Sequence, residues 1–136
     1  MGLQIQIFNT STTREINEAF ATLAQNRADA LFVSADPFFT IRRVQLANLA
    51  ARYAIPSSFS VRDIAQAGGL MSYGTNISDA YREIGVYTSR VLKGAKPAEL
   101  PVLQSTKFEL VINAQTAMNA RSYCAATATH CRRRGD

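Results

Sequence analysis

The stretch Ala30-Leu31-Phe32-Val33-Ser34-Ala35-Asp36-Pro37 (ALFVSADP, residues 30–37) decides the fold class of this chain. Four consecutive apolar residues indicate a short strand that is buried on both faces, as the strands of parallel sheets are. The polar residues that follow end this strand, and Asp36 directly before Pro37 is a favourable N-cap for a helix. The stretch therefore predicts a strand that leads through a tight connection into a helix, which is the first half of a β-α-β unit.

The same alternation of strand and helix extends along the chain in both directions. Residues 3–8 alternate apolar and glutamine side chains, which predicts a strand, and a capping box at Thr12 and Glu15 begins a helix that runs to about Gln25. Downstream, the pattern predicts a helix over residues 39–53 with Val44, Ala47 and Ala50 facing inward, a strand over 55–59, a short helix over 62–67, a strand over 70–72, a helix over 78–93, a strand over 107–112 and the start of a last helix at 113–118. Strands separated by helices of this length predict an α/β fold with a mainly parallel sheet.

Composition narrows the range of functions. The chain has 136 residues, 47% of them hydrophobic and 18% charged, which is typical of one globular domain. Its net charge of +5 comes mostly from arginines within residues 121–136, and no stripe of Lys and Arg interleaved with aromatics lies upstream. We therefore expect no nucleic-acid partner. Neither a membrane-spanning run nor a signal peptide is evident, so the chain as written is expected to be cytoplasmic.

Catalytic and metal-binding patterns are scarce. Cys124, His130 and Cys131 are the only cysteines and the only histidine, and all three lie in the last sixteen residues. They have neither a fourth ligand nor the spacing of a zinc site, and no glycine-rich phosphate loop is present. We expect no metal, no cofactor and no enzyme activity. Residues 121–136 show no clear period and are expected to be disordered.

A candidate binding site lies at one edge of the predicted sheet. Ligands bind beyond the carboxyl ends of strands in open parallel sheets, and this rule selects residues 9–12, 34–39, 57–60 and 72–76. Ser34 offers a hydroxyl, Asp36 a carboxylate for a ligand ammonium group, and Phe38 and Tyr73 offer rings for stacking. The alternative is that these residues only form turns and caps, with Asp36 as the N-cap of the second helix.

Three motifs in order, QAGGLMSYG (66–74), LKGAKPAELPV (92–102) and STKFELVIN (105–113), resemble the ABC-transporter substrate-binding family typified by tryptophan- and aromatic-amino-acid-binding proteins. The resemblance covers about Leu3 to Ala117. It implies a type I periplasmic-binding-protein fold, in which two flavodoxin-like lobes joined by hinge strands close on a ligand. Motif positions assign Asp36, Tyr73 and Gly74 to the pocket or the hinge.

The resemblance covers only the C-terminal part of that family's fold. It implies a three-layer, flavodoxin-like lobe over residues 1–120 that is incomplete, because the first lobe and the first strand of the second are missing. Residues 75–102 are expected to pack toward the first lobe, and residues 121–136 fall outside the family pattern. The implied partners are a small molecule such as an amino acid and an ABC permease, and the implied location is the periplasm.

Two other classes of function remain open from the sequence. One is the effector-sensing domain of a transcriptional repressor with the same fold, which would need a DNA-binding headpiece. The other is a small flavodoxin-like enzyme. An incomplete lobe also leaves apolar surface and an open sheet edge exposed, so we expect a homo-oligomer.

Overall fold

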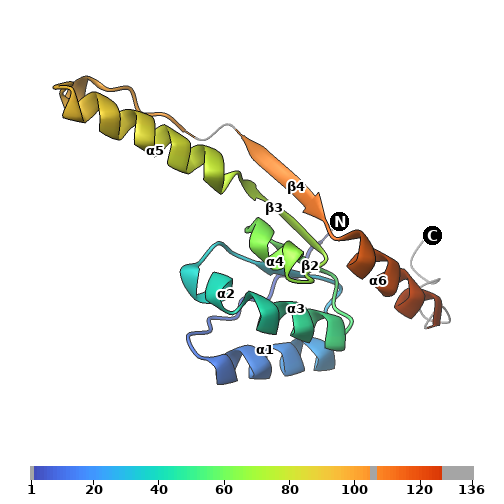
Figure 1. Cartoon of the computed structure of the whole chain (residues 1–136). Coiled ribbons are helices and arrows are strands. Elements are labelled where there is room, and N and C mark those ends of the chain that lie inside the picture. Colours follow the sequence, from blue (N-terminus) through green and yellow to red (C-terminus); the bar gives the residue numbers. More distant parts are fainter. Residues whose placement is uncertain (1, 105–106, 127–136) are drawn as a thin grey trace.

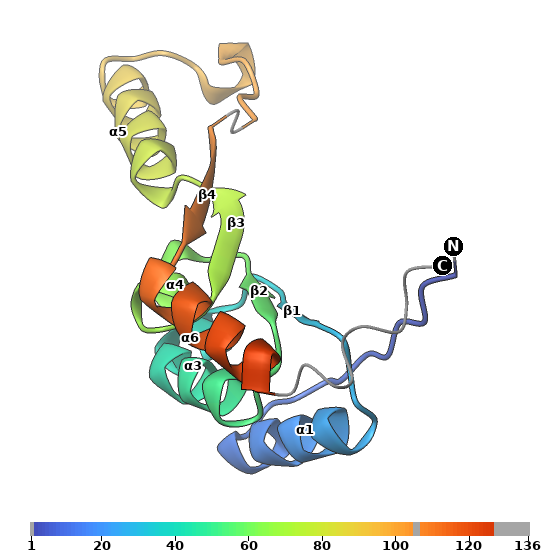
Figure 2. The same cartoon turned by 90° about the vertical axis from the view of Figure 1, so that its right-hand side faces the viewer.

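The computed structural model describes residues 2–104 and 107–126, and Figures 1 and 2 show it from two directions. Its elements, in chain order, are α1 (Thr13–Gln25), β1 (Leu31–Val33), α2 (Pro37–Ile41), α3 (Arg43–Arg52), β2 (Ser57–Phe59), α4 (Arg62–Gln66), β3 (Met71–Thr75), α5 (Ile77–Leu92), a 3-10 turn (Pro97–Glu99), β4 (Phe108–Ile112) and α6 (Ala114–Ala126). The four strands form one sheet in the order β1-β2-β3-β4. The pairs β1–β2 and β2–β3 are parallel and β3–β4 is antiparallel. This confirms the predicted α/β fold with a mainly parallel sheet.

The core lies between one face of the sheet and the helices α1, α3 and α4. Val33 and Phe59 lie opposite each other in the parallel register and are 7% and 0% exposed. The remaining core side chains come mainly from the three helices and are Ile16, Phe20, Leu23, Leu46, Ala50, Ile55 and Ile64. The opposite face of the sheet is largely exposed, with Phe32 at 67% and the cross-strand pair Tyr73 and Leu110 at 57% each. One face of the sheet is therefore covered by helices, and the other is largely open.

The strand-to-helix alternation was correct, but several boundaries were not. The helix predicted over residues 39–53 is two helices, because Arg42 leaves the helical region (φ −96°, ψ 19°) between α2 and α3. Ala47 and Ala50 face inward as predicted, whereas Val44 is 56% exposed. Residues 73–75, predicted to lie beyond the end of a strand over 70–72, belong to β3, because each of them pairs with a residue of β4.

The two ends of the chain also differ from the prediction. Residues 3–8 form no strand, and Leu3, Ile5 and Ile7 are 79–91% exposed, because no neighbouring strand pairs with them. At the other end, α6 continues to Ala126, so the prediction that residues from 121 onward lack regular structure is wrong for 121–126. The backbone at Cys124 is therefore helical, while His130 and Cys131 lie outside the described residues.

An arm, residues 76–104, projects away from the body of the molecule (Figure 1). It consists of α5, the 3-10 turn and the connector to β4, and among the described elements β3 and β4 lead from it to the body. None of the residues of α5 is buried. The Tyr87 hydroxyl donates a hydrogen bond to the Pro101 carbonyl, which holds the connector against the helix. The arm thus has local order but no hydrophobic core of its own.

Candidate functional site

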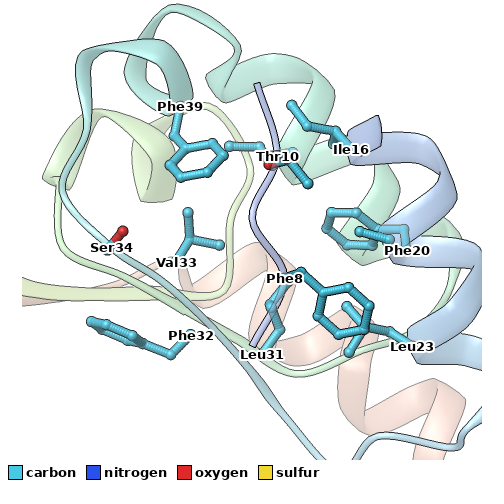
Figure 3. A pocket seen from close by; sticks show the side chains of 12 residues that line it. Phe8, Thr10, Ile16, Phe20, Leu23, Leu31, Phe32, Val33, Ser34 and Phe39 are labelled. Carbon is cyan, nitrogen blue, oxygen red and sulfur yellow. The ribbon is translucent and has the colours of Figure 1, made fainter. Parts of the chain in front are cut away.

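The candidate site is the edge of the sheet where β1, β2 and β3 end. Because these strands are parallel, their carboxyl ends meet at one edge. Ser60, directly after β2, ties this edge together: its N–H and its Oγ both donate to the Val33 carbonyl, at 3.2 and 3.3 Å. Ser34 therefore directly follows the end of β1, which the hydrogen bonds from Ser60 hold in place. It also lines a cavity of about 100 Å³, together with Thr10 and Phe39 (Figure 3).

Asp36 caps α2. Its Oδ1 accepts a hydrogen bond from the Phe38 N–H at 2.7 Å, and Pro37 occupies the first turn. The turn-and-cap role that the sequence offered as an alternative is therefore realised. The carboxylate remains exposed, and none of the described side chains donates to its Oδ2. One oxygen of Asp36 shapes the loop while the other is free to receive a donor.

Phe38 has a partner that the sequence reasoning missed. The Arg42 guanidinium lies 3.8 Å from the centre of the Phe38 ring, within the range of a cation–π contact. Arg42 is held there by hydrogen bonds to Thr13 Oγ1 (3.2 Å) and to the Phe38 carbonyl (3.3 Å). The i, i+4 spacing of Phe38 and Arg42 was the available signal, because such residues are neighbours on a helix. Arg42 therefore adds a positive charge to an edge where only Asp36 had been predicted to carry charge.

A glycine is required at position 74 because the backbone of β3 passes very close to the backbone of Ser60. Its φ is not in the left-handed region, so conformational freedom is not the reason for a glycine here. A Cβ at this position would overlap the Ser60 carbonyl oxygen and lie 3.0 Å from the Ser60 carbonyl carbon. The absence of a side chain at Gly74 allows β3 to pass beside the end of β2.

Tyr73 lies on the other side of the sheet. Neighbouring residues of a strand point to opposite faces, and Ser72 is buried on the core side at 1% exposure. The Tyr73 ring stacks on Phe108 of β4, with ring centres 5.9 Å apart and planes 18° apart. The structure therefore brings Ser34, Asp36, Phe38 and Gly74 to one edge and separates Tyr73 from them. Ser72 Oγ, which is buried without a hydrogen-bond partner in the described part of the chain, lies beneath this edge.

Charged residues are concentrated where the arm leaves the body. Lys107 Nζ lies 2.7 Å from Asp79 Oδ1, and Arg82 reaches the same oxygen at 3.3 Å. The hydrogen bond from Lys107 is the largest cause that lowers the pKa of Asp79 below its ordinary value of 3.8, with Arg82 adding to it. These contacts join the first turn of α5 to the residue before β4.

A second group of polar contacts lies where β3 and β4 lead from the body into the arm. Glu109 Oε2 of β4 accepts hydrogen bonds from Arg62 Nη1 of α4 at 3.2 Å and from Asn76 Nδ2 at 3.3 Å. Asn76 in turn caps α5, because its Oδ1 accepts from the Asp79 N–H at 2.9 Å. The junction between body and arm, residues 75–79 and 107–109, is therefore held by polar contacts together with the stacking of Phe108 on Tyr73.

The described residues show neither a metal site nor a membrane span. Within residues 2–104 and 107–126, no three His, Cys, Asp or Glu side chains come together as metal ligands. None of the helices in these ranges combines the length and apolar composition needed to cross a membrane.

An α/β lobe with polar loops at the carboxyl edge of a parallel sheet has the arrangement in which open α/β sheets place their ligands. The chain belongs to the ABC transporter substrate binding protein family, whose model matches residues 1–122. Among curated proteins, no sequence matches the chain significantly.

Solved structures agree with this assignment. The chain is 27% identical to a Streptococcus pneumonia ABC domain in complex with L-Trp, with a TM-score of 0.75 and coverage of 86% of this chain and 40% of that one. Two other structures share the fold: a conserved domain protein from Vibrio cholerae O1 biovar El Tor (18% identity, TM-score 0.70, 79% and 36% coverage) and a ligand-free, open substrate-binding protein with adhesive properties from Clostridium difficile (20% identity, TM-score 0.60, 82% and 38% coverage). The chain thus spans 36–40% of the length of these relatives.

Proposed function

We propose that this chain is the C-terminal lobe and hinge of the substrate-binding component of an ABC importer. In the complete protein, a small molecule such as an amino acid binds between this lobe and another, and an ABC permease receives it outside the cytoplasm. Lobe closure about the hinge is the working motion, and it requires no covalent chemistry. Membership of a substrate-binding family favours this function over an enzyme or a repressor domain.

The exposed apolar surface of the arm supports the proposal that the complete protein has a second lobe. Its apolar side chains are exposed, among them Tyr81 (69%), Ile84 (59%) and Leu92 (82%). Between α5 and the connector lies a groove of about 980 Å³, lined by Ile84, Tyr87, Val91, Leu100, Pro101 and Val102 among others. An exposed apolar surface of this kind marks a site of interaction. The arm is therefore proposed to pack on the first lobe, with β3 and β4 as hinge strands.

Three features of the carboxyl edge support an amino acid as the ligand. The free oxygen of Asp36 suits an ammonium group, Arg42 suits a carboxylate, and the rings of Phe38 and Phe39 offer apolar surface. Ser34, Asp36, Phe38 and Gly74 are thus the proposed ligand-side residues. Tyr73, on the opposite face and beside Phe108, is proposed to act at the hinge. The related Streptococcus structure is a complex with L-Trp, which adds support for an amino acid with an aromatic side chain.

A titration of the isolated chain with L-amino acids, followed by NMR, tests the proposed ligand site. One lobe presents only half of a closed cleft, whereas ligand pockets normally bury about 70–90% of the ligand. We therefore expect fast-exchange shifts at residues 34–38 and 74, with affinity much weaker than micromolar. Asp36→Asn should remove the shifts caused by the amino group, while the control Asp29→Asn, which precedes β1 at the opposite edge, should retain them. Micromolar affinity, or shifts confined to other residues, would contradict this assignment.

A further inference from the structure

The carboxylate of Glu109 is shared between the body and the arm. Its Oε2 accepts a hydrogen bond from Arg62 Nη1, at the start of α4 in the body, at 3.2 Å. The same oxygen accepts a hydrogen bond from Nδ2 of Asn76, the N-cap of α5 in the arm, at 3.3 Å. The Glu109 side chain is 24% exposed. One partly buried oxygen atom therefore connects a helix of the body with the helix of the arm.

The position of Glu109 in the sheet directs its side chain toward the body. Glu109 lies directly opposite Gly74 in the antiparallel pair of β3 and β4, and residues in this relation share a face of the sheet. Ser72, two residues before Gly74, is buried on that same face, which α4 covers. The stacked rings of Tyr73 and Phe108 lie on the opposite face. The Glu109 carboxylate thus lies on the side of the sheet where α4 packs.

The loop after β2 links this contact to the candidate ligand edge. Ser60 donates both its N–H and its Oγ–H to the Val33 carbonyl, directly before Ser34. Arg62 follows two residues later, at the start of α4, and reaches Glu109. Because Ser60 is bonded to the end of β1, a shift of that strand end displaces the loop and Arg62 with it. The contact at Glu109 is therefore two residues away from a group that holds the ligand edge.

The direction of the arm depends on few contacts. β3 pairs with β2 only at Met71 and Ser72, so residues 73–75 are joined to β4 alone. A two-stranded ribbon is only marginally stable by itself, and none of the residues of α5 is buried. The contact of Asp79 with Lys107 joins α5 to the residue before β4. Among the described residues, the contact at Glu109 is the one that also reaches α4.

We propose that Glu109 is a positioning residue of the junction. By accepting from Arg62 and Asn76 with one oxygen, it sets the orientation of α5 and couples that orientation to the carboxyl edge of the sheet. In treating a change of this orientation as part of lobe closure, the inference rests on the proposed function. Coupling between two sites acts in both directions, so a change at Glu109 alters the environment of Ser34 as well. Exposed ion pairs add little to global stability, but an arm without a core needs little energy to be turned.

Residual dipolar couplings measured by NMR on the whole chain test this role. In the wild type, α5 should fit the same molecular alignment as α1 and α3. Glu109→Gln removes the charge that attracts Arg62 and weakens the acceptor, so the couplings of α5 should become smaller and should no longer fit the alignment of the body. Glu99→Gln is the matched control, because it removes the same charge from an exposed pair with Lys96 inside the arm. The control should keep the wild-type alignment of α5.

A second variant separates the contact at Glu109 from the cap of α5. Asparagine and aspartate are equally good N-caps, so Asn76→Asp should keep the helical chemical shifts of α5. It replaces the donor to Glu109 with a like charge, and α5 should therefore lose its alignment with the body. In both variants the cross-strand contacts between Tyr73 and Leu110 should persist. The amide of Ser34 should shift in Glu109→Gln, which reports the coupling in the reverse direction.

Four results would each overturn the proposal. They are a wild-type α5 that does not share the alignment of the body, a Glu109→Gln variant whose α5 keeps it, an equal loss in Glu99→Gln, and an unchanged amide of Ser34. Loss of the pairing of β3 with β4 in the variants would overturn it too, since Glu109 would then only stabilise the ladder.

The measurement needs no ligand, so its failure is distinguishable from failure of the proposed function. A chain whose arm depends on Glu109 but which shows no shifts with amino acids keeps the positioning role and loses the amino-acid assignment. A chain that shows those shifts while its arm is indifferent to Glu109→Gln does the reverse.

Discussion

Replacement of Gly74 by alanine should destabilise the protein, although alanine is normally the safer residue in regular structure. The added Cβ would overlap the Ser60 carbonyl oxygen, closer than the 3.0 Å that real Cβ atoms essentially never cross. The obstacle is backbone, so rotation of a side chain cannot relieve it. Either β3 or the loop after β2 must move.

The cost of that movement follows from what Ser60 holds. Shifting Ser60 weakens its two hydrogen bonds to the Val33 carbonyl, and the loss of one such bond costs about 1 kcal/mol. Forcing extra volume into a packed region costs about 1–3 kcal/mol more. Gly74→Ala should therefore lower the free energy of unfolding by about 2–4 kcal/mol. With a urea m-value of about 2 kcal/mol/M, the unfolding midpoint should fall by about 1–2 M.

Equilibrium urea unfolding followed by circular dichroism measures this effect, with Gly85→Ala as the matched control. A Cβ at Gly85, inside α5, meets nothing within 4 Å, so this change should raise helix stability by about 0.5–1 kcal/mol. The two glycine substitutions thus have opposite expected signs. A Gly74→Ala variant as stable as the wild type would refute the close approach of β3 to Ser60.

Three further predictions concern the core, a cap and pH. Phe59→Ala should lower the free energy of unfolding by about 3–5 kcal/mol in the same urea assay, since Phe59 is 0% exposed, while Phe32→Ala should change it little. Thr12→Ala removes the capping box of α1 and should lower the free energy of unfolding by about 1 kcal/mol, whereas Thr22→Ala, in the helix interior, should not lower it. Equal losses in the two variants would show that the cap does not stabilise the helix. For Asp79, a folded-state pKa below the ordinary 3.8 means that the ionised group stabilises the protein at higher pH. The stability difference between wild type and Asp79→Asn should therefore be constant well above pH 3.8 and vanish as pH falls through the lower folded pKa; a difference that grows on acidification would reverse the assigned sign.

The polar contacts at the junction help to explain why the arm keeps a defined position without a core. Lys107 and Arg82 meet Asp79, and Arg62 and Asn76 meet Glu109, at the two places where the chain crosses between body and arm. Exposed ion pairs contribute little stability individually. They can be rearranged at low cost, which suits the hinge role proposed for this junction.

Local sequence patterns were sufficient for the elements and for part of the site. The apolar run at residues 31–33 and the alternation at 108–112 became strands, and the caps at Thr12, Asp36 and Asn76 begin helices as their residue types predict. The parallel arrangement followed from the alternation of these elements, and with it the edge that carries Ser34 and Asp36. These features depend on residues within one or two turns of each other, so one sequence is enough to predict them.

Which segments pair as strands of the sheet was decided only by the tertiary structure. Residues 3–8 have the pattern of a strand and form none. Residues 73–75 lie beyond the predicted strand and yet belong to β3, because Leu110, Glu109 and Phe108 of β4 pair with them. The same pairing turns Tyr73 to the exposed face. A period of two shows that a segment can join a sheet, but hydrogen bonding to a strand distant in the sequence determines whether it does. For this reason the sequence alone determined the α/β lobe, and the tertiary structure decided which side chains share the carboxyl edge of its sheet and which edge of the sheet stays open.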